Sequence, residues 1–138
     1  MTFLLDTNVV SETRRRRPSS TVMAWFSSVP RTSVYLSVLV IGELRHGAEL
    51  IRRRDAQQSV ALEGWLNSLI EESKERILPV TLEIAEEWGR MNVPDKLPTV
   101  DGLLAATARI HGMTLVTRDT GRLALRGVTV LNPFEPIL

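Results

Sequence analysis

The sequence has no cysteine, almost no net charge and no long apolar run, and each absence excludes a class of protein. Without cysteine, the 138-residue chain has no disulfide scaffold, no thiol nucleophile and no cysteine zinc site. A formal charge of +1 gives no overall electrostatic field that would indicate nucleic-acid binding. The longest uncharged apolar stretch, residues 34–42, is much shorter than the ~20 residues of a membrane helix. Because the first residues also lack a signal-peptide pattern, we expect a cytoplasmic protein without a membrane partner.

The remaining composition is that of an ordinary globular protein with an uneven choice of charged residues. Apolar residues make up 43% of the chain and charged residues 24%, and the length predicts a single domain over residues 1–138. Of the 17 basic residues 15 are arginine, whereas only five of the 16 acidic residues are aspartate. The positions of these few aspartates are therefore informative.

Short apolar segments alternate with segments of helical periodicity along the chain. Ser20 and Thr99 are expected to cap the helices that follow them, and Gly112 is expected to end a helix. Such alternation favours a parallel sheet covered on both faces, so the predicted fold class is α/β, a three-layer α/β/α domain with a central sheet of about five strands. The predicted strands are residues 2–5, 33–37, 77–80, 113–117 and 128–131; the predicted helices include residues 21–28, 38–51, 56–72, 83–91, 100–111 and 119–125.

Four acidic residues lie at or near predicted junctions between strands and helices. Asp6 directly follows the first strand, Asp119 comes two residues after the fourth, Asp101 lies in the first turn of its helix, and Glu43 lies in the helix after the second strand. Sites in open parallel sheets form beyond the carboxyl ends of the strands. Taken singly, each acid also has a structural explanation, such as an Asx-turn, a helix cap or a favourable interaction with the helix dipole.

Taken together, the four acids favour a metal site. Glu43 interrupts an otherwise apolar helix segment, where an unpaired charge is costly. Four neighbouring carboxylates would repel one another, and a divalent cation would remove that repulsion. Oxygen ligands without cysteine or a suitable histidine pair favour Mg²⁺ or Mn²⁺ over zinc. Such a site is typical of metal-dependent phosphodiester hydrolysis.

Five segments in order also carry a family resemblance over nearly the whole chain: residues 5–12 (LDTNVVSE), 37–47 (SVLVIGELRHG), 101–108 (DGLLAATA), 115–119 (LVTRD) and 130–133 (VLNP). On these segments the sequence resembles the PIN-domain ribonucleases, specifically the VapC-type toxins of bacterial type II toxin–antitoxin pairs and their FitB-like subgroup. The resemblance implies a PIN-like fold and a Mg²⁺- or Mn²⁺-dependent endoribonuclease. It also implies a homodimer and a cognate antitoxin, with which the toxin forms a hetero-oligomer.

The resemblance assigns roles to individual positions. It implies that four acids hold the metal and carry catalysis, namely Asp6, Glu43, Asp101 and Asp119. Four polar residues are expected to support them, namely Asn8, Ser11, Thr117 and Asn132, with the Thr117 hydroxyl orienting Asp119.

Two questions stay open at this point. The run Arg14, Arg15, Arg16 and Arg17 is either a contact to RNA phosphates or a solvated loop. The alternative function is a PIN-fold binding module with weak or no nuclease activity, which acts through an antitoxin-like partner and DNA. Nucleotide-binding modules are disfavoured, because the glycines form neither G-x-G-x-x-G nor a Walker A pattern.

Overall fold

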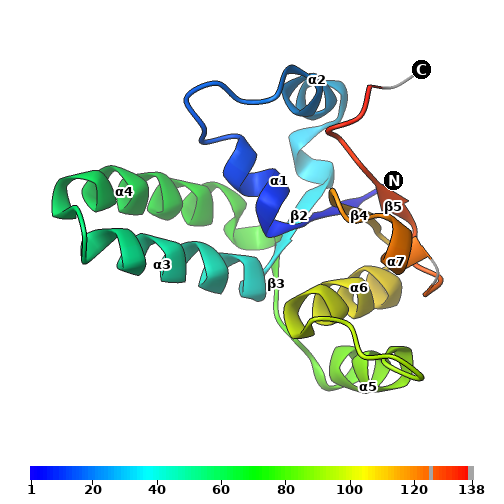
Figure 1. Cartoon of the computed structure of the whole chain (residues 1–138). Helices are drawn as coiled ribbons and strands as arrows, with labels where there is room; N and C mark the ends of the chain where they lie inside the picture. The colour runs from blue at the N-terminus through cyan, green and yellow to red at the C-terminus, as the bar shows by residue number, and fades with distance from the viewer. Residues whose placement is uncertain (125, 137–138) are drawn as a thin grey trace.

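A computed structural model describes residues 1–124 and 126–136, and at its centre lies a five-stranded sheet (Figure 1). All the recorded strand pairs are parallel, and the strand order is β3-β2-β1-β4-β5. This arrangement confirms the predicted α/β class with a parallel sheet. The strands are β1 (Phe3–Leu5), β2 (Val34–Ser37), β3 (Ile77–Leu78), β4 (Thr114–Val116) and β5 (Val130–Leu131).

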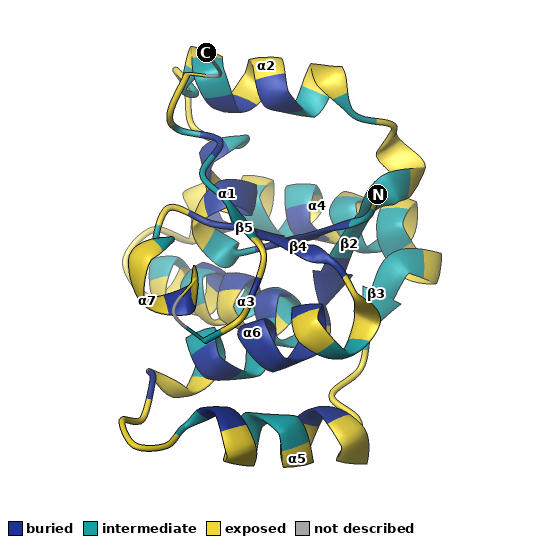
Figure 2. Cartoon of the chain, turned by 90° about the vertical axis from the view of Figure 1, so that its right-hand side faces the viewer, coloured by how far each residue is buried: buried dark blue, intermediate teal, exposed yellow. Residues whose placement is uncertain are grey.

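Helices cover both faces of the sheet, as Figures 1 and 2 show together. Helices α1 and α2 lie on one side, α5 and α6 on the other, and α3 and α4 form a hairpin that projects past the sheet. Among the described residues, no helix is long and apolar enough to cross a membrane. The helices are α1 (Thr7–Glu12), α2 (Ser20–Ser28), α3 (Val38–Arg52), α4 (Ala56–Ser73), α5 (Leu82–Met91), α6 (Thr99–His111) and α7 (Gly121–Ala124), with 3₁₀ turns η1 (Arg31–Ser33) and η2 (Lys74–Arg76).

The most buried helix, α6, packs closely because its buried face is built from small residues (Figure 2). A side chain on Gly102 would place its Cβ only 3.0 Å from Nε1 of Trp88, so the glycine permits the close approach of α5. This packing fixes the position of the first turn of α6, which carries Asp101. The small residues of the buried face include Gly102, Ala105, Ala106 and Ala108.

Element boundaries differ from the sequence prediction in ways that the backbone explains. Ser19, rather than Ser20, caps α2, because its hydroxyl accepts from the Val22 amide. Thr99 does not cap α6: the extended Pro98 holds the cap position, and Thr99 is the first helical residue. Gly112 ends α6 with φ = 65°, as predicted, in the left-handed region that glycine tolerates. The predicted helix over residues 119–125 begins only at Gly121, and residue 125 lies outside the described residues.

Candidate active site

The strand order places a crevice between β1 and β4. The chain proceeds from β1 to β2 and β3 on one side and then returns to β4 and β5 on the other. In such a sheet, ligands bind at this switch point, beyond the carboxyl ends of the strands. Asp6 follows β1 and Thr117 follows β4 at that edge. The N-terminal turn of α6 lies at the same edge, since α6 leads into the opposite end of β4.

Asp6 is held by two hydrogen bonds at the end of the central strand. Its Oδ1 accepts from the Thr7 amide at 2.7 Å, which makes Asp6 the N-cap of α1. Its Oδ2 accepts from the Thr117 hydroxyl at 2.8 Å. The Thr117 oxygen in turn accepts from the Asp119 amide at 3.1 Å. Thr117 therefore contacts the main chain of Asp119, whereas the carboxylate that its hydroxyl contacts belongs to Asp6.

Glu43 approaches this group from α3. The Thr7 hydroxyl donates to Glu43 Oε1 at 2.5 Å and thereby connects the start of α1 to the second turn of α3. Since the Thr7 amide is bound to Asp6, one residue holds two carboxylates that are 37 positions apart in the sequence. This bridge leaves Oε2 of Glu43 available for another partner.

Asp101 and Asp119 share a contact with one arginine. Arg122 Nη2 lies 2.6 Å from Asp119 Oδ2 and 4.0 Å from Asp101 Oδ2. Burial raises the pKa of the Asp101 carboxyl above its ordinary value, and the negative charges of Asp6 and Asp119 raise it further. The positive charge of Arg122 opposes this increase, whereas Glu43 adds to it. The other three acids are therefore near enough to repel a negative charge on Asp101.

An open cavity of ≈ 600 Å³ lies over three of these acids. It is lined by Asp6, Glu43 and Asp101, and also by Asn8 and His46. Asn8 therefore lies beside these three acids. The volume is large enough for a phosphate group and its neighbours, so the acids are accessible to a substrate.

Ser11 and Asn132 lie away from this cavity. Ser11 lines the neighbouring groove beside Thr7. Asn132 lies in a separate cavity with Thr21 and Trp25, and its Oδ1 accepts from the Phe134 amide at 3.0 Å. The structure therefore gives Asn132 a role in the C-terminal turn and does not place it with the acids.

The arginine run borders the groove that adjoins the acids. This groove, ≈ 280 Å³, is lined by Thr7 and Glu43 at one end and by Arg14, Arg15 and Trp65 at the other. The Arg14 guanidinium carbon lies 5.7 Å from the centre of the Trp65 ring, while Arg15 pairs with Glu12 at 3.4 Å. Two of the four arginines thus line the groove, and the other two, Arg16 and Arg17, are exposed in the α1–α2 loop.

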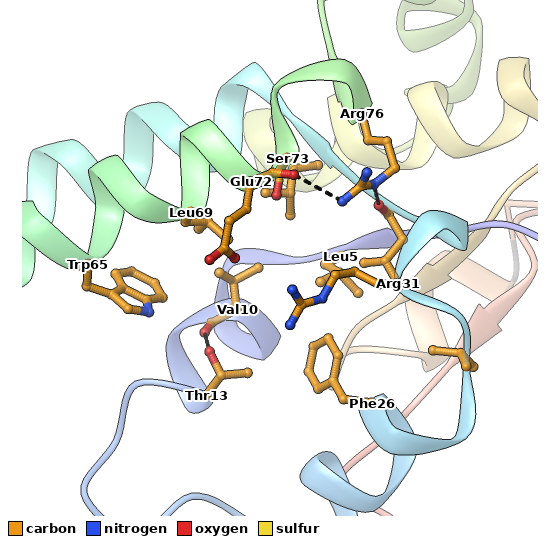
Figure 3. Close-up of a pocket in the computed structure, with 13 residues that line it drawn as sticks. Leu5, Val10, Thr13, Phe26, Arg31, Trp65, Leu69, Glu72, Ser73 and Arg76 are labelled. Atoms are coloured by element: carbon orange, nitrogen blue, oxygen red, sulfur yellow. Dashed lines mark hydrogen bonds between the residues drawn. The ribbon is translucent and has the colours of Figure 1, made fainter.

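Trp65 also lines another cavity, which is shown in Figure 3. Its ≈ 300 Å³ lie between α1, α2, β2 and α4. The close-up shows Arg31, Glu72 and Arg76 around this cavity. Charged groups therefore surround an apolar hollow, which suits a protein side chain better than a nucleotide. Its apolar lining includes Leu5, Val10, Phe26, Leu36, Trp65 and Leu69.

The acids have the chemistry of a Mg²⁺ or Mn²⁺ site, although they do not form a closed set of ligands. Within residues 1–124 and 126–136, no group of three or more Asp, Glu or His side chains is arranged so that it could hold a metal ion. The Asp119 carboxylate is bound to Arg122 instead. The donors are all oxygens, and their mutual repulsion raises the pKa of Asp101, so a hard divalent cation fits the charge and chemistry of the cluster.

Comparison with known proteins assigns the family. The model of the PIN domain matches residues 3–127, a range that contains all four acids. The chain belongs to the PIN-domain family. Within that family it is a VapC-type protein: it is 36% identical to Toxin FitB from Neisseria gonorrhoeae, over 96% of this chain and 99% of that protein. It is also 33% identical to VapC ribonuclease Y4jK from Sinorhizobium fredii, over 97% and 99% of the two chains.

A solved structure supports the same PIN-domain assignment. The chain resembles a chain in the structure of FitAB bound to an IR36 DNA fragment, with a TM-score of 0.91 and 33% identity over 99% of both chains. The family resemblance seen in the sequence motifs is therefore confirmed.

The sequence motifs assign no role to three residues whose contacts in this PIN domain are well defined. Thr7 was part of a motif, but its hydroxyl bond to Glu43 is a contact between distant segments. Arg122 could have been suspected from its spacing, because it carries the opposite charge only three residues after Asp119, although Asp119 precedes the helix. Glu12 is buried and accepts from the Ser19 amide at 2.8 Å, so this acid holds the start of α2.

Proposed function

We propose that the protein is a metal-dependent endoribonuclease that acts in the cytoplasm as the toxin of a toxin–antitoxin pair. The observation that carries the proposal is the nearness of four carboxylates at the switch point of a PIN-domain sheet, three of which, Asp6, Glu43 and Asp101, line an open cavity. Relatives named as a toxin and as a VapC ribonuclease match the chain over nearly its whole length.

Asp6, Glu43, Asp101 and Asp119 would hold Mg²⁺ or Mn²⁺. Such a cation, when bound, lowers the pKa of a water molecule and stabilises negative charge on a phosphate. The chain contributes the orientation: Thr117 holds Oδ2 of Asp6, and Thr7 holds Oε1 of Glu43. Oε2 of Glu43 is then free to accept a hydrogen bond from the attacking water, which directs an oxygen lone pair at phosphorus.

The experiment that tests the proposal is digestion of total cellular RNA by the purified protein. We expect cleavage with Mg²⁺ or Mn²⁺ and none with EDTA. Without a divalent cation, the four carboxylates provide no electrophile that could stabilise negative charge on the phosphate. Intact RNA under all conditions would contradict the proposal. It would favour the alternative of a PIN-fold binding module, which the absence of a closed ligand set in the described residues supports.

The groove beside the acids is the proposed path of the RNA. A single RNA strand would leave the acidic cavity past Thr7. Its phosphates would then contact Arg14 and Arg15. Arginine contacts to phosphate give affinity without reading sequence. Trp65 lines the same groove, and a base would stack on its ring in place of the Arg14 guanidinium that now lies over it. Arg16 and Arg17 extend the positive charge along the loop.

Replacing Arg14 and Arg15 together with alanine is therefore expected to weaken RNA binding. The slope of log K against log salt should fall by about 1.4, because each phosphate contact on a single strand contributes ~0.7. Fluorescence anisotropy with single-stranded RNA in EDTA measures this without cleavage. The matched control replaces Lys74 and Arg90, each of which pairs with an acid three residues before it and does not line the groove. An equal change of slope in both double variants would refute the path.

The proposed partners follow from the relatives and from the apolar cavity. Solved complexes of similar chains include FitAB bound to a DNA fragment. We assign the cavity beside Trp65 to the cognate antitoxin, since an apolar side chain would fill the hollow while its neighbours meet Arg31 and Glu72. Two toxin chains are proposed to form a homodimer within this hetero-oligomer.

A further inference from the structure

Arg122 contacts the same carboxylates that the proposed metal would need. Its guanidinium donates to Asp119 Oδ2 at 2.6 Å, and the same nitrogen lies 4.0 Å from Asp101 Oδ2. The arginine belongs to the short helix α7, three residues after Asp119. Its side chain is 57% exposed and that of Asp119 is 44% exposed, so the pair can separate without disturbing the core.

Other arginines near this part of the chain have different partners. The Arg118 guanidinium lies 3.7 Å from the centre of the Phe134 ring. Arg126 donates to the main-chain carbonyls of Met91 and Asp95. Among the ion pairs recorded for the described residues, Arg122 is the cation that meets the acids of the cluster. Its position is therefore specific to the site.

We propose that Arg122 is an internal counter-ion that occupies the acidic cluster until a divalent cation displaces it. The inference rests on the proposed metal site. A guanidinium 2.6 Å from Asp119 Oδ2 takes up one acceptor position of that oxygen, and its positive charge opposes a cation beside it, so the two compete for the carboxylate. The arginine relieves the repulsion among the carboxylates in the metal-free protein. Metal binding must then break this ion pair, which makes the free energy of metal binding less favourable.

The consequence is that Arg122 lowers the affinity of the site for metal. An exposed ion pair of this kind accounts for up to about fivefold in an equilibrium constant. Arg122 is thus a positioning residue: it sets how much metal the site requires.

The test is direct titration of the full-length protein with Mn²⁺ in the absence of RNA, in which free Mn²⁺ is followed by its paramagnetic resonance signal. Arg122→Gln is expected to bind Mn²⁺ about fivefold more tightly than the unmodified protein. Arg118→Gln removes the same charge from a side chain on Phe134, and its affinity should stay within about twofold. Arg122→Lys keeps the charge without the planar guanidinium, so its Mn²⁺ affinity should lie between those of the unmodified protein and Arg122→Gln.

Two results would overturn the inference in different ways. Equal Mn²⁺ affinity of Arg122→Gln and the unmodified protein, or weaker binding by the variant, would refute the counter-ion alone and leave the metal site intact. No Mn²⁺ binding by any of the proteins would refute both the metal site and the counter-ion. If Arg122→Gln fails to fold, Arg122→Lys decides, because unchanged or weaker binding by that variant also refutes the displacement.

Discussion

Replacing Asp6 with asparagine is expected to reduce RNA cleavage at least about 100-fold while the fold is kept, equivalent to ~2.7 kcal/mol of lost transition-state stabilisation. Asp6 ends the central strand, and both of its carboxylate oxygens are held in place. Asparagine keeps the shape and can still accept from the Thr7 amide, so α1 remains capped. It loses the negative charge that would hold the cation.

The measurement is the initial rate of RNA cleavage with Mn²⁺, together with a thermal unfolding curve of each protein. Asp55→Asn is the matched control, because Asp55 also caps a helix and accepts from a backbone amide, that of Gln58, away from the proposed site. Its activity should be unchanged. If Asp6→Asn cleaves RNA within a few-fold of the unmodified rate, Asp6 is not part of the catalytic site.

The fold could be predicted because its determinants are local and repeated. Each strand is a short apolar run, and each helix has an apolar face, so the alternation alone indicates a parallel sheet. Asp6 and Asp119 could then be placed near one another, since strands β1 and β4 end at the same edge. Asp101 could be placed at the same edge, because it lies in the first turn of α6 and α6 leads into the opposite end of β4.

Contacts between distant side chains could not be predicted in this way. The Thr7 hydroxyl reaches Glu43 because α3 crosses near the start of α1, and no spacing in the sequence reports that crossing. The Thr117 hydroxyl accepts from the amide of Asp119, two residues further along the chain, but it also donates to the carboxylate of Asp6, which follows the neighbouring strand and could not be assigned from the sequence. Asn132 followed a strand at the expected edge, yet β5 is the outermost strand and carries it away from the crevice.

Thr117 is the residue whose substitution best separates positioning of the acids from general stability. Thr117→Val keeps the shape of this buried side chain but removes both of its hydrogen bonds, to Asp6 and to the Asp119 amide. Groups that orient metal ligands typically contribute 10–100-fold to affinity or activity, so we expect cleavage to fall at least about tenfold. The unsatisfied Asp119 amide should also cost ~1–2 kcal/mol of unfolding free energy.

Thr117→Ser provides the comparison, because it removes a methyl group but retains the hydroxyl. Valine should change both the cleavage rate and the Mn²⁺ concentration at half-maximal activity. We expect both quantities to be mostly restored in the serine variant. A purely structural role predicts instead that the two variants lose stability but retain the activity of each folded molecule. Equal activity of the valine and serine variants would therefore show that the hydrogen bond to Asp6 does not matter for catalysis. A loss confined to valine would show that catalysis depends on a single hydroxyl that holds two of the four acids.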